Sequence, residues 1–441
     1  MSLTISVIGT GYTGVVHAAC LADMGHTVIG VDSDAAKVES LSRGVAPTIE
    51  PGLNELLAKV LPTGRLRFTT DYAEASDADV HFICVGTPVH NGDAEADTSY
   101  IFAAVQSLAP HLSGRPLVVG KSTVPVGTAA QLRESLRLAA PKGVRARLAW
   151  NPEFLREGFA IQDTVAPDRF VYGVDGPSAE ADVALLDEVY AGPLATGTPR
   201  LVTNFQTAEL VKVAANAFLA TKISFINAMA EVCEAAVADV VMLSDGLEHD
   251  DRIGAEFLDT GFGGDKVPKD LRALMARAGE LGADEAVEFL HEIDSINVRQ
   301  RARTVDLARE QCGGTLVGKR VAVLGAAFTP DSDDIRDSPA LDIAQAAHKE
   351  GALVTVHDPL AMDAAQRAHP DLEYADSVEE ACLHADVVLH LTAWKQFSEI
   401  DPAKLAVVVA NPTIVDGRNT LNSERWSSAG WSYRSIGGTT I

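Results

Sequence analysis

A glycine-rich turn near the amino terminus narrows the possible folds of this chain more than any other feature. Residues 9–14 read GTGYTG, which places Gly9, Gly11 and Gly14 in a G-x-G-x-x-G spacing between a strand-like run and a helix-like run. Glycines at these positions permit a tight turn and let a pyrophosphate approach the N–H groups at a helix start. Asp32 closes the next strand-like run, where an acid accepts from ribose hydroxyls. The segment therefore predicts a dinucleotide site.

The acidic residue also indicates which dinucleotide is bound. Asp32 is followed by Ser33 and Asp34, and this acidic stretch repels a 2′-phosphate, so we expect NAD rather than NADP. We expect no metal, because the cysteines show no metal-ligand spacing. The expected cofactor-binding residues are Gly9, Gly11, Tyr12, Gly14, Asp32, Lys37, Gly86, Thr87 and Thr123.

Strand-like and helix-like patterns alternate at both ends of the chain, which predicts an α/β protein with two Rossmann-like doubly wound domains. The expected strands are 5–8, 27–31, 80–85, 117–120 and 148–150 in the first domain, and 320–324, 353–357, 387–390 and 405–409 in the second. The middle of the chain has helical periodicity and few strand signals. We therefore predict an NAD-binding domain over residues 1–202, a helical connector over 203–312, and a second Rossmann-like domain over 313–441. The last domain opens with Gly325-Ala326-Ala327, without the fingerprint, and should hold something other than a dinucleotide.

Composition excludes several classes of partner. The formal net charge is -25, which repels phosphate backbones and anionic membrane surfaces, so we expect neither nucleic acid nor membrane as a partner. Charged residues interrupt the most apolar stretch, 208–242, and no signal peptide is visible, so a cytoplasmic location is expected. The five cysteines are scattered and odd in number, as is typical of buried thiols in a reducing compartment.

Two polar side chains interrupt an apolar helical stretch that begins after Thr207. Lys212 and Asn216 are four residues apart and share one face of this helix, which is apolar on nearly every side and should be central and buried. A buried ammonium needs a carboxylate or a phosphate. Spacing alone supports a structural ion pair and a catalytic or substrate-binding lysine equally.

A second polar segment, NPEFLREG at 151–158, follows a strand-like run. Asn151 is suited to cap a helical turn and Pro152 to occupy its first position, so that Glu153 and Glu157 would face the same way. Like charges one turn apart are unfavourable unless a cation or a shared proton relieves them. The pair is either a solvated acidic turn or a tuned acid–base group.

Several motifs together carry a resemblance to one enzyme family. They are KSTVPVGT at 121–128, NPEFLREG at 151–158, the AELVKVAANAFLATKISFIN run at 208–227, RIG at 252–254, GFGGDKVPKD at 261–270, DSDDIRDSPALD at 331–342 and DGRN at 416–419. The chain resembles the nucleotide-sugar 6-dehydrogenases of the UDP-glucose and GDP-mannose dehydrogenase family over essentially its whole length.

The resemblance implies roles for individual residues. The catalytic shell would consist of Thr123, Glu153, Glu157, Lys212, Asn216 and Asp270, in which the threonine and a glutamate order a water and the lysine and asparagine stabilise oxyanions. Phe154, Leu155, Phe257, Gly263 and Arg336 would bind the sugar nucleotide. Arg252 would reach it across a homodimer. The resemblance also implies that residues 203–312 include the dimerisation region and that residues 313–441 form the nucleotide-sugar (UDP) binding domain.

The chain departs from the family at two positions. Lys266 stands where the family has a cysteine that carries the substrate as a thiohemiacetal and thioester, and a lysine must first lose a proton and then forms an imine or a carbinolamine. Thr329 stands where the family usually has a lysine at the nucleotide end. Because the PKD ending at 268–270 is typical of the glucose and mannose branch, the resemblance implies a UDP-hexose, with UDP-glucose favoured.

Three functions follow, in order of preference. The first is an NAD-dependent oxidoreductase that oxidises a UDP-hexose to its 6-aldehyde, with Lys266 either idle or trapping the aldehyde. In a variant of this function, a water held by Thr123 and Glu157 hydrates the aldehyde, and the hydrate is then oxidised to the uronate. The second is a redox-neutral epimerase with tightly bound NAD. The third is a non-catalytic nucleotide-sugar binding protein.

Overall fold

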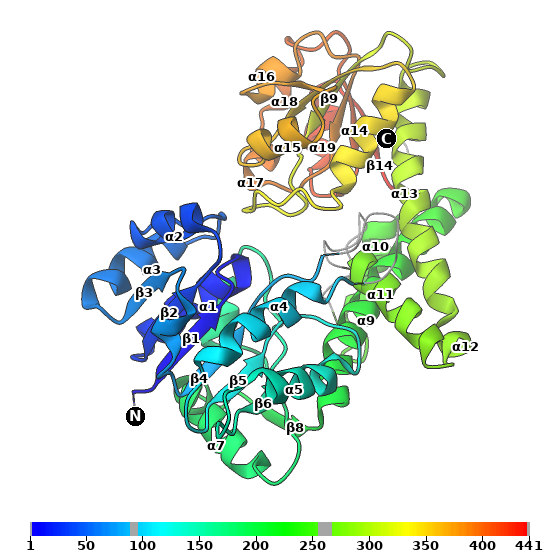
Figure 1. Ribbon diagram of the computed structural model, residues 1–441. Coiled ribbons are helices and arrows are strands. Elements are labelled where there is room, and N and C mark those ends of the chain that lie inside the picture. Colours follow the sequence, from blue (N-terminus) through cyan, green and yellow to red (C-terminus); the bar gives the residue numbers. More distant parts are fainter. Residues whose placement is uncertain (1, 89–95, 255–266, 439–441) are drawn as a thin grey trace. The chain divides into compact units, whose positions relative to one another are not determined.

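A computed structural model of the chain describes residues 2–88, 96–254 and 267–438, which fall into two compact units (Figure 1). One unit comprises Met1–Ala215 with Arg272–Gly282, and the other comprises Asn216–Leu271 with Ala283–Ile441. Each unit contains one largely or wholly parallel sheet with helices packed on it. The α/β fold, with two Rossmann-like domains and a helical central region, is confirmed.

The sheet of the first unit has eight strands in the order β3-β2-β1-β4-β5-β6-β7-β8. All neighbouring strands are parallel except β6 and β7. The strands are β1 (Thr4–Ile8), β2 (Thr27–Val31), β3 (Leu66–Thr69), β4 (Val80–Ile83), β5 (Leu117–Gly120), β6 (Arg147–Trp150), β7 (Phe170–Gly173) and β8 (Arg200–Thr203). The predicted strands are confirmed to within two residues, whereas β3, β7 and β8 were not foreseen.

Helices cover both faces of this sheet, because successive strand residues point to opposite sides. Leu117 and Val119 of β5 belong to one apolar core and Val118 to the other. The helices of this unit are α1 (Tyr12–Asp23), α2 (Ala35–Ser42), α3 (Leu53–Val60), α4 (Ser99–Leu108), α5 (Thr128–Ala139), α6 (Ala160–Val165), α7 (Ala179–Val189) and α8 (Ala191–Ala195), with short 3-10 turns η1 (Leu61–Thr63), η2 (Tyr72–Ala75) and η3 (Ala109–His111). The start of α2 is fixed by Asp34, whose carboxylate accepts from the N–H groups of Ala36 and Lys37.

The middle of the chain is helical, as predicted. Its helices are α9 (Phe205–Ala236), α10 (Val240–Glu248), α11 (Val267–Glu280), α12 (Asp284–Val287) and α13 (Phe289–Gln311). By length and composition α9 is apolar enough to span a membrane, a test that core helices also pass, and 44% of its most apolar window is buried in the protein. The helix is apolar on nearly every side, but the prediction that it is therefore buried is wrong for part of its surface, because Phe218 is 64% exposed and Leu210 44%.

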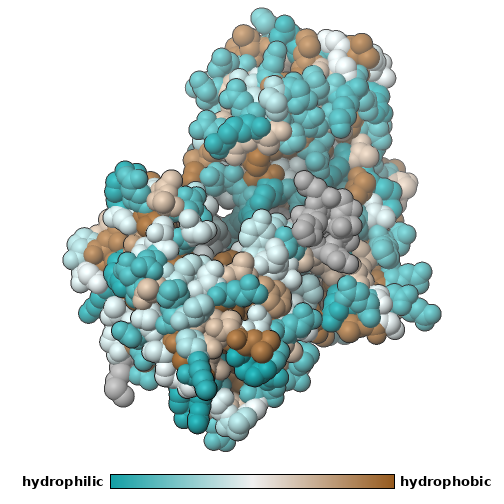
Figure 2. All heavy atoms as spheres, viewed as in Figure 1, coloured by the Kyte–Doolittle hydropathy of each residue, from teal (hydrophilic) through white to brown (hydrophobic). Residues whose placement is uncertain are grey.

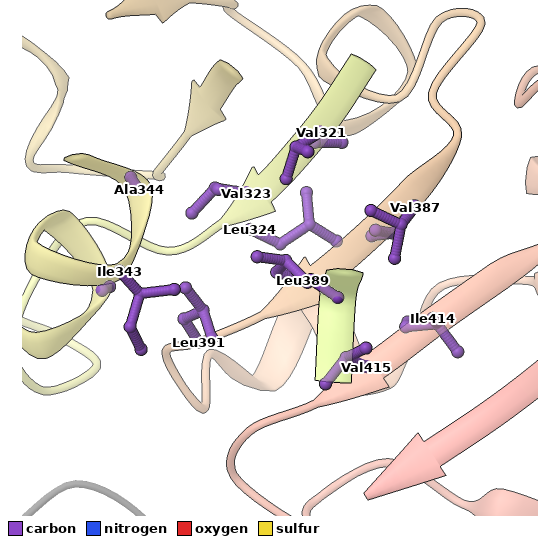
Figure 3. Close-up of a cluster of buried hydrophobic side chains, with 14 of the residues drawn as sticks. Val321, Val323, Leu324, Ile343, Ala344, Val387, Leu389, Leu391, Ile414 and Val415 are labelled. Carbon is purple, nitrogen blue, oxygen red and sulfur yellow. The ribbon is translucent and has the colours of Figure 1, made fainter. Parts of the chain in front are cut away.

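The sheet of the second unit has six strands in the order β11-β10-β9-β12-β13-β14, all parallel. The strands are β9 (Arg320–Leu324), β10 (Leu353–His357), β11 (Glu373–Tyr374), β12 (Val387–His390), β13 (Thr413–Asp416) and β14 (Ser432–Ser435), and the helices are α14 (Pro339–Lys349), α15 (Met362–Ala368), α16 (Val378–Ala381), α17 (Lys395–Ser398), α18 (Pro402–Leu405) and α19 (Ser423–Ser428). Figure 3 shows its core, a cluster of buried side chains that includes Val323 of β9, Leu389 of β12 and Ile343 of α14. Hydrophilic residues predominate on the visible surfaces of both units, with scattered hydrophobic ones between them (Figure 2).

One predicted strand is wrong. Residues 405–409 form the end of α18 and the turn after it, where the N–H groups of Val408 and Val409 donate to the carbonyl of Leu405. The preceding Asp401 caps α18 and Pro402 occupies its first turn, so the chain enters this apolar run already helical. The strand, β13, begins at Thr413.

Candidate active site

The turn after β1 has the geometry that a dinucleotide requires. Gly9 adopts a φ of +88°, which favours glycine, and a Cβ at Gly14 would lie 1.9 Å from the Gly9 carbonyl oxygen. A Cβ at Gly11, by contrast, would meet nothing within 4 Å. Gly9 and Gly14 therefore close the turn against the start of α1, and Gly11 leaves open space in front of the helix N–H groups, where a pyrophosphate fits.

Asp32 organises this turn from the end of β2. Its Oδ2 atom accepts from the backbone N–H of Thr10 at 2.8 Å, from the Thr10 hydroxyl at 2.9 Å and from Lys37 Nζ at 3.0 Å. Burial by itself raises the pKa of Asp32. The hydrogen bonds to Oδ2, together with one from the N–H of Asp34, lower this pKa by a larger amount, so the net shift is downward. Among the described residues a single donor, the N–H of Asp34, reaches Oδ1, which leaves capacity for a ribose hydroxyl.

A cavity of about 210 Å³ lies in front of the turn. Its lining includes five residues that the sequence predicted, Gly9, Gly11, Asp32, Lys37 and Gly86. It also includes Tyr72 and Cys84, which sequence reasoning missed because neither belongs to the motif. Thr87 does not line the cavity; its hydroxyl donates to the backbone carbonyl of Thr123 at 2.8 Å and so ties the loop after β4 to the loop after β5.

The segment that begins at Asn151 is not the helical turn predicted for it. Residues 151–156 have no regular structure, and the Asn151 side chain is buried instead of capping: its Nδ2 donates to the carbonyl of Val171, and its Oδ1 accepts from Lys121 and Tyr190. Long-range partners thus compete successfully for a side chain that local geometry assigns to a cap. The inference that Glu153 and Glu157 share one helical face falls with it.

Glu153 and Lys212 form a buried ion pair. Glu153 Oε1 lies 3.4 Å from Lys212 Nζ, and both side chains are 6% exposed. Glu153 Oε2 accepts from the backbone N–H of Leu155 at 2.7 Å. The Phe154 ring lies beside this pair, with Lys212 Nζ 5.6 Å and the guanidinium carbon of Arg169 4.0 Å from its centre. Lys212 was expected to be either a member of a structural ion pair or a catalytic or substrate-binding lysine. The two interpretations are compatible, because its carboxylate partner, Glu153, is itself a predicted catalytic residue.

The start of α9 is held in place by Glu209, one turn before Lys212. This residue is 1% exposed, and its carboxylate accepts from the backbone N–H groups of Gly127 and Ala129 at the start of α5, at 2.7 and 2.6 Å. Burial raises the pKa of Glu209. Because the bond is formed three residues from Lys212, it limits movement of the lysine relative to the loop that carries Thr123. Sequence reasoning did not assign Glu209 a role. The signal that could have identified it is an acidic residue within an apolar helical run.

A second buried lysine, Lys121, lies close to the pair. It is 6% exposed, and its Nζ donates to Asn151 Oδ1 at 3.1 Å. A cavity of about 30 Å³, large enough for a single water, is lined by Lys121, Glu153, Phe154 and Leu155, with His17 and Tyr190 behind them. Sequence reasoning recognised the KSTVPVGT motif without assigning its lysine a role.

Asn216 and Asp270 form a separate contact in the other compact unit. Asn216 Nδ2 donates to Asp270 Oδ2 at 2.6 Å, and Asp270 is 6% exposed. The structure thus brings these two predicted catalytic residues together. Lys266, Phe257 and Gly263 lie outside the described residues.

The two predicted substrate-binding arginines are exposed. The side chain of Arg252 is 89% exposed and pairs with Asp250 at 2.6 Å, and that of Arg336 is 72% exposed and pairs with Asp334. At Thr329, after β9, the buried hydroxyl oxygen has no hydrogen-bond partner in the described part of the chain.

Comparison with known proteins places the chain beside one family. Three models of the UDP-glucose/GDP-mannose dehydrogenase family match: the NAD binding domain at residues 3–193, the central domain at 206–299 and the UDP binding domain at 322–423. The UDP-glucose 6-dehydrogenase of Rhizobium meliloti is 40% identical over 438 residues, which cover 99% of each chain. That of Bacillus subtilis is 40% identical over 437 residues, which cover 98% of this chain and 93% of the relative.

Solved structures agree with these matches. A UDP-glucose dehydrogenase from Pyrobaculum islandicum has a TM-score of 0.90 at 35% identity, covering 100% of this chain and 98% of the other. A UDP-D-ManNAc dehydrogenase from Pyrococcus horikoshii has a TM-score of 0.85 at 26% identity, covering 99% of both chains.

Proposed function

Because the chain belongs to the UDP-glucose/GDP-mannose dehydrogenase family and is an NAD-dependent nucleotide-sugar dehydrogenase, we propose that its substrate is a UDP-hexose, with UDP-glucose favoured, and that oxidation at C6 stops at, or is slow beyond, the 6-aldehyde. Two curated relatives named UDP-glucose 6-dehydrogenase support the choice of sugar. The sequence at position 266 supports the incomplete oxidation.

The observation that carries the first oxidation is the buried pair of Glu153 and Lys212. NAD, when bound, accepts a hydride. The protein must therefore hold C6 of the sugar next to the cofactor and accept the proton of the C6 hydroxyl. An ammonium that is 6% exposed is only weakly screened by water, so Lys212 stabilises negative charge that develops on the C6 oxygen. Glu153 keeps the lysine oriented and accepts protons released at the site.

The second oxidation is the step that Lys266 alters. In the family a cysteine adds to the aldehyde, and hydride loss from the thiohemiacetal leaves a thioester for water to hydrolyse. An amine that adds to the aldehyde loses water to form an imine and cannot form a thioester. A lysine with the reference pKa of about 10.4 is protonated at neutral pH, and a protonated amine adds only slowly to an aldehyde. We therefore expect one NADH per sugar.

Counting NADH against sugar in single-turnover experiments on a panel of nucleotide sugars tests this proposal. The unmodified protein should yield one NADH and an aldehyde, whereas Lys266→Cys should raise the yield towards two NADH and release uronate. Lys266→Ala is the matched control, because it removes the amine without supplying a thiol and should leave the first hydride transfer intact. Rapid release of two NADH and uronate by the unmodified protein would show that a hydrated aldehyde is oxidised without a thioester.

The same experiments separate the remaining alternatives. Borohydride added during turnover should fix a sugar adduct on Lys266 if that residue traps the aldehyde, and no adduct should form if it is idle. An epimerase would change the sugar without net NADH, and a binding protein would do neither. A degraded catalytic shell would be expected of a binding protein, but Thr123, Glu153, Glu157, Lys212, Asn216 and Asp270 are all present.

We further propose that the chain acts as a homodimer. Phe218, Phe225 and Val232 of α9 are spaced by seven residues, so they share one face, and they are 64%, 47% and 55% exposed. A stripe of this kind favours burial against a second copy. Phe218→Glu with Phe225→Glu should give monomers in analytical ultracentrifugation, whereas Leu138→Glu, an equally exposed position on α5, should not. Unchanged assembly of the double variant would exclude this face.

The cytoplasmic location and the lack of nucleic-acid and membrane partners stay predictions from the acidic composition.

A further inference from the structure

One buried carboxylate joins the cofactor turn to the segment that carries the catalytic acids. Glu50, in the loop between α2 and α3, is 6% exposed. Its Oε2 accepts from the Tyr12 hydroxyl at 2.5 Å and from the backbone N–H of Gly158 at 2.9 Å. Its Oε1 accepts from the backbone N–H of Ala160 at 2.8 Å. Tyr12 and the two backbone donors are far apart in sequence, so Glu50 is a bridge between two segments.

Both segments belong to predicted parts of the active site. Tyr12 is the first residue of α1, directly after Gly11 of the pyrophosphate turn. Gly158 and Ala160 end the irregular segment that includes Glu153 and begin α6. One phenol and one carboxylate thus connect the first turn of α1 to the chain that follows Glu153.

The surroundings of this bridge keep the Tyr12 phenol protonated. No lysine or arginine pairs with Glu50 within residues 2–88, 96–254 and 267–438, so its three donors alone compensate the buried carboxylate. Burial, followed by the hydrogen bond to Glu50 and the charges of Glu50 and Glu157, raises the pKa of Tyr12 well above its ordinary value. The phenol therefore remains protonated and donates its hydrogen bond to Glu50.

We propose that Glu50 is a positioning residue that couples cofactor binding to the order of the 153–160 segment. NAD fixes the turn at Gly11, the turn fixes Tyr12, and Glu50 then holds the N–H groups of Gly158 and Ala160. The effect of this coupling on catalysis rests on the proposed function. The coupling itself requires only NAD and the compact unit that contains Met1–Ala215. Coupling of this kind appears as local protection that changes with the ligand.

Hydrogen exchange of the full-length protein, with and without NAD, measures the coupling directly. In the unmodified protein, NAD should slow exchange of the Gly158 and Ala160 amides at least fivefold, about the worth of one net hydrogen bond. Tyr12→Phe removes the cofactor-side link and keeps both backbone bonds to Glu50, so the slowing should be lost even when NAD is saturating. Tyr100→Phe is the control, because Tyr100 is an exposed residue of α4 outside the cofactor cavity, and the slowing should persist.

Kinetics provides the second readout. Tyr12→Phe and Glu50→Gln should each lower kcat at saturating NAD more than they raise KM for NAD, and the double variant should be no worse than the more damaged single variant, because both break one bridge. Retained NAD-dependent slowing in Tyr12→Phe, or additive effects on kcat, would overturn the inference and leave Glu50 a structural residue. Failure of the proposed function would instead appear as no NADH from any nucleotide sugar, with the exchange result unaffected.

Discussion

Removing the buried ammonium of Lys121 should stabilise the protein at neutral pH. Its Nζ has one hydrogen-bond partner, Asn151, and no carboxylate lies within 4 Å of it among the residues that the structure describes. Burial is the largest influence, and it lowers the pKa of Lys121 from 10.5 to about 8. The folded state therefore holds this proton less tightly than the unfolded state does.

The sign and size of the effect follow from this shift. Between about pH 8 and pH 10.5 the unfolded chain binds more protons, so the free energy of unfolding rises with pH, and below pH 8 the whole penalty is present. A shift from 10.5 to about 8 corresponds to about 3 kcal/mol. Lys121→Met keeps the apolar stem and loses one hydrogen bond worth about 1 kcal/mol, so we expect a net gain of about 2 kcal/mol at pH 7.

Urea unfolding of the parent and Lys121→Met at pH 7 and pH 10, followed by circular dichroism, tests this reasoning. With two units in the chain, the transition to compare is the one that NAD moves to higher urea. The gain should be present at pH 7 and should largely disappear at pH 10, while Lys142→Met, at an exposed position, should change nothing at either pH. A variant that is less stable than the parent by the same amount at both pH values would refute the argument that the buried charge is costly.

Two further predictions concern the cofactor and the chemistry. Asp32→Ala should weaken NAD binding by about 10- to 100-fold in calorimetry, because the carboxylate that anchors Thr10 and lines the cofactor cavity is lost, and an unchanged affinity would remove Asp32 from the site. Lys212→Ala should lower turnover by more than it lowers nucleotide-sugar affinity, because a contact made in the transition state is removed. A thermal melt must show that this variant folds, since Glu153 loses its buried partner. A fall in affinity alone would reassign Lys212 to phosphate binding.

The sequence by itself determined the features that depend on neighbouring residues. The glycine turn at 9–14, the acid at 32 and the strands on either side were predicted correctly, because turn geometry and strand alternation are encoded within a few residues. The family resemblance extended this local information to the domain types. The same local reasoning failed at residues 405–409, where a helix that starts at Pro402 continues into an apolar run that also suits a strand.

The tertiary structure decided which polar groups meet. Local rules make Asn151 a helix cap, yet it accepts from Lys121 and Tyr190, which are 30 and 39 residues away. Glu50 has no distinctive sequence context, and its role comes from Tyr12 and Ala160, which are 38 and 110 residues away. A buried polar group must find partners wherever the packed chain supplies them, and the free-energy cost of leaving it unpaired exceeds most local preferences. Such pairings depend on the packing of the whole unit, so no short window of sequence contains them.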